Sequence, residues 1–177
     1  MLRKIFLYGV IAGLIVGLTL FTMTVTLQGR IPMGAVGMAV GYLTMLVALS
    51  AVFVGIKRHR DIDRGGAIRF WPAFGMGVAI SFIASVLYVL SWEAALAVTG
   101  ADFPEIFASA MIESAKAKGA NAQALAKINA DMQQFKIQYA NPLFRMPMTF
   151  VEIFPVGLLV SLFSAGLLRN PRVLPAR

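Results

Sequence analysis

The sequence predicts an all-α polytopic membrane protein, and three observations lead to this fold class. First, 59% of its 177 residues are hydrophobic, whereas soluble domains contain about 45–50% apolar residues. Second, the apolar residues form long runs, and a helix needs about 20 residues to cross a bilayer. Third, small residues recur at every fourth position within the runs, a spacing that lets transmembrane helices pack closely. The four predicted spans are residues 5–27, 33–56, 73–98 and 147–168.

The first span follows the basic residues Arg3 and Lys4, as the apolar segment of a signal peptide also does. It is longer than the roughly 7–15 residues of such a segment, and it carries no cleavage motif of small residues before Gln28. We therefore expect a retained transmembrane helix. Because Gly29 and Pro32 break the chain directly afterwards, the first two spans should be antiparallel neighbours.

The segment 57–72 is predicted to be a cytoplasmic loop. Its five basic residues are opposed only by Asp61 and Asp63, and cytoplasmic loops carry an excess of lysine and arginine. An even number of spans places both termini on the same side, where ten of the sixteen lysines and arginines then lie. We therefore expect both termini in the cytoplasm. The basic residues of the loop are Lys57, Arg58, Arg60, Arg64 and Arg69.

Two interpretations of these five residues stay open. They can bind phosphate or anionic lipid headgroups, with Phe70 and Trp71 as anchors at the membrane interface. Alternatively, their charge only sets the orientation of the protein and attracts anionic lipid in a general way. The loop lacks the spacing of a phosphate-binding loop that precedes a helix. Within it, Gly65 and Gly66 predict a tight turn.

Residues 99–145 are polar enough to leave the membrane and are predicted to form an extracytoplasmic helical hairpin. Asp102 and Glu105 resemble a capping box that begins the first helix, and Gly119 ends it. Asn121 can cap the second helix, which ends before Pro142. An apolar stripe with steps of three and four residues runs along this second helix. The stripe consists of Leu125, Ile128, Met132, Phe135 and Tyr139.

This apolar stripe must be buried against another surface, and the sequence leaves four choices open. They are the first helix of the hairpin, the outer rim of the bundle, the lipid surface and a partner membrane protein. The third span ends close to the hairpin with Tyr88, Trp92 and Glu93. Tyrosine and tryptophan favour the membrane interface, so we place the end of this span there.

A ridge of small residues on every span predicts a compact bundle, because helices in lipid associate through close packing rather than through the hydrophobic effect. The first span has three glycines in register and is therefore the candidate for a homodimer contact. The glycines of the ridges are Gly9, Gly13, Gly17, Gly37, Gly41, Gly77 and Gly157, and Ala73, Ser81, Ser85, Ser161 and Ala165 continue them.

Glu152 is the polar residue of the fourth span that suggests a function. It lies five residues inside the span, which corresponds to ~7 Å of helical rise. Pro155 cannot donate a hydrogen bond to the carbonyl of Val151, so a free acceptor lies beside the carboxyl group. Together with Thr149 and Glu93, these groups predict a proton or cation site. The alternative is a structural carboxyl that is hydrogen-bonded within the bundle.

The composition argues against other chemistry. The sequence has no cysteine, which excludes disulfides, thiolate nucleophiles and cysteine metal sites. His59 is its only histidine, so we expect neither a histidine metal site nor a catalytic base, and no cofactor or enzyme activity. The basic residues lie against the membrane, which argues against nucleic acid as a partner. A lipid enzyme with residues 57–60 as a phosphate clamp ranks last because it lacks a nucleophile.

Three stretches resemble segments of one bacterial family. They are residues 55–61 (GIKRHRD), 139–142 (YANP) and 149–158 (TFVEIFPVGL). The family is DUF4199, a domain of unknown function, and the resemblance extends over nearly the whole chain. It implies a small four-helix protein of the bacterial cytoplasmic (inner) membrane and implies no activity. His59 stands where the resemblance leads us to expect an aromatic residue.

Two functions are compatible with these observations. The first is a non-catalytic accessory or assembly protein that acts through the hairpin and the small-residue ridges. The alternative is a small proton- or cation-coupled transporter centred on Glu152. The expected partners are the phospholipid bilayer and either another membrane protein or a second copy of the chain.

Overall fold

The computed structural model describes residues 1–27, 35–100 and 102–175, and over these residues the chain contains helices and no β-strand. The helices are α1 (Leu2–Thr26), α2 (Ala35–Arg58), the π-helical turn η1 (His59–Asp63), α3 (Phe70–Thr99), α4 (Phe103–Ala117), α5 (Ala122–Tyr139) and α6 (Pro142–Leu168). Among the described residues, four segments are long and apolar enough to cross a membrane: Leu2–Thr26, Gly37–Asp63, Phe70–Thr99 and Pro142–Leu168. The predicted all-α class is confirmed, and these four segments are the candidates for the four predicted spans.

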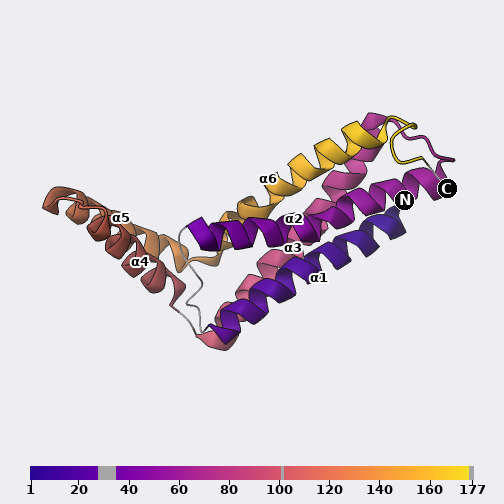
Figure 1. Ribbon diagram of the computed structural model, residues 1–177. Helices are drawn as coiled ribbons and strands as arrows, with labels where there is room; N and C mark the ends of the chain where they lie inside the picture. Colours follow the sequence, from indigo (N-terminus) through magenta and orange to yellow (C-terminus); the bar gives the residue numbers. More distant parts are fainter. Residues whose placement is uncertain (28–34, 101, 176–177) are drawn as a thin grey trace.

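Helix α3 is the central element of the bundle, because α1 and α6 both pack along it (Figure 1). Helix α2 contacts α1, α3 and α6. The buried core between the four helices includes Leu49, Ile56, Met76, Ile80 and Ile153. Both termini lie at one end of the bundle, and the hairpin formed by α4 and α5 projects from the opposite end (Figure 1).

The close contact between α1 and α3 depends on the glycines of α1. An ideal Cβ atom added at Gly9 would lie 2.7 Å from the Cβ atom of Ile83, and one added at Gly13 would lie 2.7 Å from that of Leu87. Gly17 faces the same helix at equally close range. Helix α3 therefore covers this ridge, which leaves it unavailable for the homodimer contact that the sequence suggested.

Helices α3 and α6 interlock through small residues on both sides. A Cβ atom at Gly77 would lie 2.8 Å from that of Ser161, and one at Gly157 would lie 2.6 Å from that of Ser81. The Ser81 and Ser161 hydroxyls both donate to the Gly157 carbonyl, at 3.2 and 2.7 Å. Because interhelical hydrogen bonds in membrane proteins contribute only about 0.6 kcal/mol each, the close backbone approach is the main source of this contact.

The first half of α2 stands apart from the bundle. The buried residues of this helix begin at Met45, whereas Met38 and Leu43 are 60% and 63% exposed. A Cβ atom at Gly41 would meet no atom within 4 Å. The prediction that Gly41 packs against another helix of this chain is therefore wrong over the described residues, and Gly37 lies in the same half. The apolar side chains of this half would contact lipid in a bilayer.

The segment predicted as a loop from residue 57 to residue 72 is partly helical. The π-helical turn η1 extends α2 to Asp63, and α3 begins at Phe70. Between them, Gly65 and Gly66 adopt positive φ angles of 63° and 90°, which glycine tolerates without a steric penalty. The turn predicted at this pair is thus present, within a connection shorter than expected.

Side-chain caps begin both helices of the hairpin, as the sequence predicts. The Asp102 carboxylate accepts a hydrogen bond from the Glu105 amide at 3.2 Å, and the Asn121 side chain accepts one from the Ala124 amide at 2.8 Å. After α4, Gly119 has a φ of 77° and turns the chain back. These local signals explain why α4 and α5 form an antiparallel pair.

Helix α6 begins five residues earlier than the predicted span. The Asn141 side chain caps it by accepting a hydrogen bond from the Leu143 amide at 3.0 Å. Pro142 occupies the first turn, where a helix does not need an amide donor. Arg145 consequently lies inside the helix rather than ahead of it, and Pro147, the first residue of the predicted span, lies in the helix interior.

Candidate functional site

An ion pair between Glu93, near the end of α3, and Arg145, near the start of α6, is the centre of the candidate site. The Nε atom of Arg145 donates to Oε1 of Glu93 at 2.7 Å, and Nη2 donates to Oε2. The side chains of Arg145 and Glu93 are only 17% and 19% exposed. A two-point contact of this kind fixes the relative orientation of the partners. It ties the two helices together where they meet the hairpin.

Tyr139, at the end of α5, joins this ion pair to the hairpin. Its carbonyl accepts a hydrogen bond from Nη1 of Arg145 at 3.3 Å, and the guanidinium lies 5.6 Å from the centre of its ring. Its hydroxyl accepts a hydrogen bond from Nε1 of Trp92 at 2.8 Å. Burial raises the pKa of Tyr139 to about 12 against the opposing effect of the Trp92 hydrogen bond. The phenol therefore stays neutral at physiological pH.

Aromatic rings fill the base of the hairpin around Tyr139. The ring centres of Trp92 and Phe103 lie 5.0 Å apart, and those of Phe107 and Phe135 lie 5.6 Å apart. Phe135 also contacts Tyr139 at 5.2 Å. Such aromatic pairs contribute about 0.5–1.5 kcal/mol each beyond the area that they bury. Two members of the predicted apolar stripe are therefore packed against α4 and α3.

The remaining stripe residues lie further from the bundle. Leu125, Ile128 and Met132 are half-buried in α5, which packs along α4. The structure thus places the stripe against the first helix of the hairpin, which is one of the four surfaces that the sequence left open.

Glu152 lies seven residues beyond Arg145 along α6 and has a different partner. Its carboxylate lies near the hydroxyl of Tyr88 on α3. Tyr88 is 4% exposed, whereas Glu152 keeps part of its side chain accessible at the surface of the bundle. A carboxyl group that lies beside a phenol and keeps one accessible side can exchange a proton or contact a cation.

The four predicted members of the proton or cation site do not come together. Glu93 is engaged in its ion pair, and the Thr149 hydroxyl donates to a carbonyl one turn back in its own helix at 3.0 Å. Pro155 lies exposed on α6. The candidate site therefore consists of Glu152 and Tyr88. Sequence reasoning assigned Tyr88 only to the membrane interface and missed this contact.

Arg60, at the other end of the bundle, is fully buried. Its Nε atom donates to the Asp61 carboxylate at 2.7 Å, Nη1 donates to the carbonyl of Val173 at 2.9 Å, and Nη2 donates to that of Leu174. We call this arrangement the Arg60 clasp. The prediction that Arg60 binds lipid headgroups is wrong, because these internal partners and burial keep its guanidinium away from the surface.

The other four predicted headgroup-binding residues differ in their environment. Lys57 donates to Asp61 at 2.6 Å and is 32% exposed. Arg58, Arg64 and Arg69 are exposed and form no ion pair with another described residue. These three arginines are therefore the members of the set that are open to lipid.

His59 is also part of the internal structure at this end. It is 4% exposed, and its Nδ1 atom lies 2.7 Å from Oδ2 of Asp63. Lys4 of α1 donates to the same oxygen at 2.8 Å. This contact connects η1 to the start of α1, and it gives the only histidine of the chain a structural position.

The geometry defines the class: a small polytopic helical-bundle membrane protein with a polar cluster at each end. Over the described ranges, no three His, Asp or Glu side chains are grouped in a way that could hold a metal ion. The profile of the family described as "Protein of unknown function (DUF4199)" matches residues 7–170, nearly the whole chain. The chain belongs to this family, as the resemblance in the sequence predicted. No curated protein and no solved structure matches it.

Proposed function

We propose that this protein is a non-catalytic accessory or assembly protein of the bacterial inner membrane, which presents the α4–α5 hairpin to a partner membrane protein on the extracytoplasmic side. The observation that supports the proposal is the projection of the hairpin away from the bundle (Figure 1). The Glu93–Arg145 ion pair and the Trp92–Tyr139 hydrogen bond hold its base. A binding element whose orientation is fixed in advance loses less entropy when it associates.

The outer side of α5 offers a residue that can test this proposal. Ile137 is 78% exposed and, from the helical period, lies on the side opposite the apolar stripe. Replacing Phe135 would be a less informative test, because its ring packs against Phe107 and the change would disturb the hairpin itself.

The test is native mass spectrometry of the complex, gently solubilised from its own membranes. We expect the wild type to carry a second polypeptide in a fixed ratio, and we expect Ile137→Glu to lose it. Ile62→Glu is the matched control, since Ile62 is 69% exposed at the opposite end of the molecule. A wild-type protein recovered as a bare monomer or homodimer would contradict the proposal, and so would retention of the partner by Ile137→Glu.

A second candidate function is a small proton- or cation-coupled transporter centred on Glu152. The nearby Tyr88 hydroxyl and the accessible side of the carboxyl group favour it. Pro155 adds an unpaired backbone acceptor in the same helix, since it cannot donate to the Val151 carbonyl. Ionisable groups at membrane depth commonly lie on ion or proton pathways.

Ion flux into reconstituted vesicles tests this second function. Glu152→Gln keeps the shape of the side chain but removes its charge, so we expect it to abolish proton or cation movement. Glu113→Gln, an exposed position on the hairpin, serves as the control and should conduct like the wild type. If Glu152→Gln conducts normally, or if wild-type vesicles leak no more than empty ones, the transporter hypothesis is refuted.

A further inference from the structure

We propose that the chain binds an anionic phospholipid in the leaflet on the side of its termini. One acyl chain would lie in an apolar groove along α3, and the phosphate would contact Arg69 and Arg3 at the end of that groove. This site is separate from the hairpin and from Glu152, so it goes beyond both functions proposed above.

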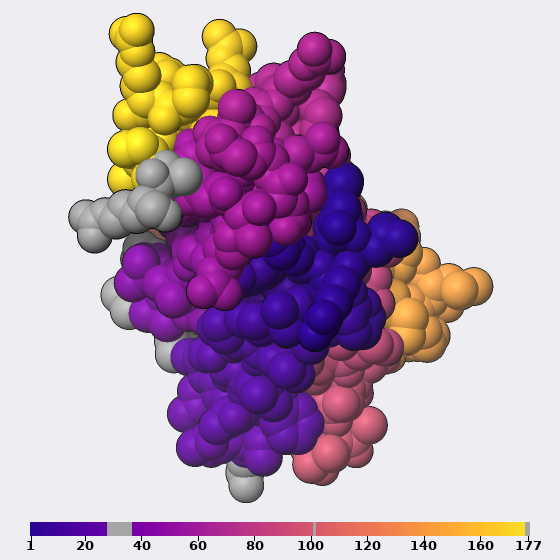
Figure 2. Space-filling model, turned by 90° about the vertical axis from the view of Figure 1, so that its right-hand side faces the viewer, coloured from indigo at the N-terminus to yellow at the C-terminus, as the bar shows by residue number. Residues whose placement is uncertain are grey.

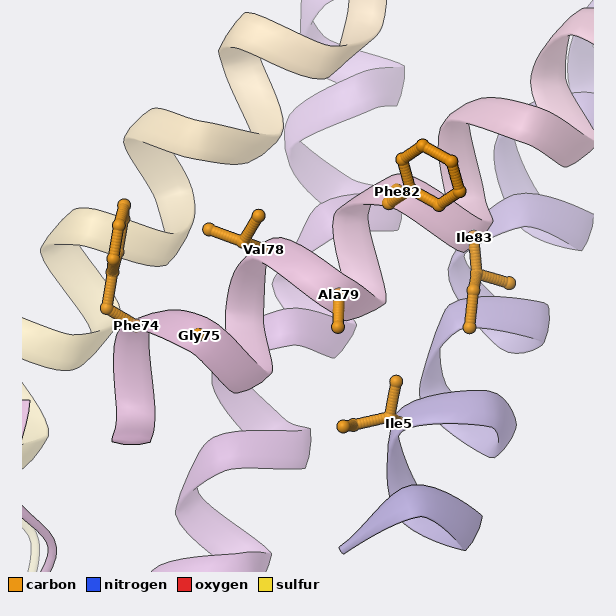
Figure 3. Close-up of a pocket in the computed structure, with 7 residues that line it drawn as sticks. All are labelled: Ile5, Phe74, Gly75, Val78, Ala79, Phe82 and Ile83. Atoms are coloured by element: carbon orange, nitrogen blue, oxygen red, sulfur yellow. The ribbon is translucent and has the colours of Figure 1, made fainter. Parts of the chain in front are cut away.

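The groove runs along the face of α3 that lies between α1 and α6 (Figure 3). Its floor is open at Gly75, where an added Cβ atom would meet nothing within 4 Å. From Gly75 to Phe82 the groove follows α3 for about 10 Å, judged from the helical rise. Every residue that lines it is apolar. These residues are Ile5, Phe74, Gly75, Val78, Ala79, Phe82 and Ile83.

Aromatic residues mark the end of the groove that is nearer the termini. Phe74 stacks on Phe70 with 5.8 Å between ring centres, and Trp71 contacts Phe74 edge-on at 6.2 Å. Trp71 is 75% exposed. An exposed tryptophan at the start of a membrane-spanning helix is typical of the headgroup level. This end of the groove therefore opens where lipid phosphates lie.

The other end of the groove closes at Phe82. Its ring contacts Phe150 and Phe154 of α6 edge-on, with ring centres 5.7 and 6.3 Å apart. These contacts hold Phe82 across the face of α3, although its side chain is still 52% exposed. The groove is thus a half-leaflet feature that fits part of one acyl chain.

Two arginines lie at the same end of the molecule as the open end of the groove. Arg69 is the N-cap residue of α3 and directly precedes the aromatic residues, while Arg3 lies two residues before Ile5 of the groove. Both arginines are exposed, and neither forms an ion pair with another described residue. Figure 2, which faces this end, shows the first turn of α1 beside the segment around residues 55–65.

The acidic residues at this end do not neutralise these arginines. Asp61 is bound by Lys57 and Arg60, and Asp63 is bound by Lys4 and His59. The two arginines therefore keep a surplus of positive charge exposed at this end, and this charge matches a phosphate diester. An apolar groove beneath the charge selects a molecule that carries an acyl chain, so an anionic phospholipid is the occupant that fits both features.

The role of the arginines in lipid selection is tested by native mass spectrometry. The protein is taken from mixed micelles that contain equal amounts of phosphatidylglycerol and phosphatidylcholine. We expect the wild type to retain phosphatidylglycerol preferentially. Arg69→Gln should lower the ratio of the two retained lipids about fivefold, the usual effect of one basic residue near an anionic surface. Lys127→Gln, at an exposed position on the hairpin, is the control and should leave the ratio unchanged. Equal retention of both lipids by the wild type would overturn the proposal.

The groove is tested separately with Gly75→Leu, which fills it. This change should remove most of the retained phosphatidylglycerol, while Gly41→Leu should not, although both glycines face open space on spanning helices. Circular dichroism should show unchanged helix content for both variants, because an added Cβ atom meets no neighbour at either position. If Gly75→Leu retains as much lipid as the wild type, general charge attraction explains the binding and the proposed site is wrong.

Discussion

Arg60 shows how strongly the role of a single residue depends on residues that lie far away in the sequence. It belongs to a run of basic residues that all look alike in the sequence. In the structure it is buried, and two of its bonds go to carbonyls at Val173 and Leu174. No local pattern distinguishes it from Arg58, which is exposed. A buried guanidinium without such partners would be costly, so the clasp offsets the cost of burying Arg60.

We expect Arg60→Gln to lower the free energy of unfolding by about 1–3 kcal/mol, because the two carbonyls would lose their donor and Asp61 would keep only Lys57. Chemical unfolding in detergent micelles measures this change. Arg58→Gln is the matched control and should stay within about 0.5 kcal/mol of the wild type. Equal stability of the two variants would show that the clasp adds nothing.

Tyr139 gives a prediction in the alkaline range. Its pKa rises from 10.0 to about 12 in the folded protein. Below pH 10 the phenol is protonated in both the folded and the unfolded chain. Between pH 10 and 12 the unfolded chain releases this proton first, so the stability should fall by about 2–3 kcal/mol.

The measurement compares wild-type protein with Tyr139→Phe in unfolding experiments from pH 8 to 12. The variant should be less stable at pH 8 by about 1–3 kcal/mol, because the buried indole N–H of Trp92 loses its acceptor. Its stability should then fall less steeply above pH 10. Parallel curves for the two proteins would contradict the assigned pKa.

At the scale of the helices, the register between α3 and α6 explains the candidate site. Gly77 lies against Ser161, and Ser81 lies against Gly157. Twelve residues beyond Ser81 is Glu93, and twelve residues before Gly157 is Arg145. The antiparallel register that the small residues set therefore brings this ion pair together.

This register can be worked out from the sequence, but only by comparing the small-residue spacing of two helices and not from the spacing within one helix. The ridges on the third and fourth spans were visible as patterns, and aligning them as antiparallel partners would have predicted the contact between Glu93 and Arg145. The contact of Tyr88 with Glu152 depends on how a long side chain crosses between helices, which a one-dimensional pattern does not encode. The caps at Asp102 and Asn121 were predictable because they act within one turn.

The glycines of α1 give a prediction at the same scale. Gly13→Ala should destabilise the protein by about 2 kcal/mol, because the new methyl group would meet the Leu87 side chain at 2.6–2.7 Å and push α1 away from α3. Gly75→Ala should be neutral or stabilising by up to about 1 kcal/mol, since alanine favours helix and its Cβ meets no atom. Thermal unfolding in micelles compares the two variants, and a stable Gly13→Ala would contradict the close packing.

At the scale of the whole molecule, the two ends of the bundle differ in the balance of their basic and acidic residues. Arg145 and Lys136, near the hairpin, are paired with Glu93 and Glu105. At the end with the termini, exposed arginines such as Arg64 exceed the available carboxylates. The sequence alone predicts this asymmetry, because it depends on the number of lysines and arginines at each end and not on detailed packing.

The orientation can be tested because the chain has no cysteine. Ile62→Cys and Lys127→Cys place single thiols at exposed positions on opposite ends. In intact spheroplasts, we expect a membrane-impermeant maleimide to label position 127 and not position 62. Permeabilised cells should show labelling of both positions, and the reverse pattern in intact cells would invert the proposed topology.

The Arg60 clasp also sets an order of events during synthesis. Arg60 leaves the ribosome more than a hundred residues before its acceptors at Val173 and Leu174. Until α6 has been inserted and the following residues have returned to this end, the guanidinium must stay in water or at the lipid headgroups. A chain that stops before residue 173 would therefore keep this end open. The clasp thus distinguishes a finished molecule from an unfinished one, and a bulky fusion placed directly after Leu168 would hold the protein in its immature form.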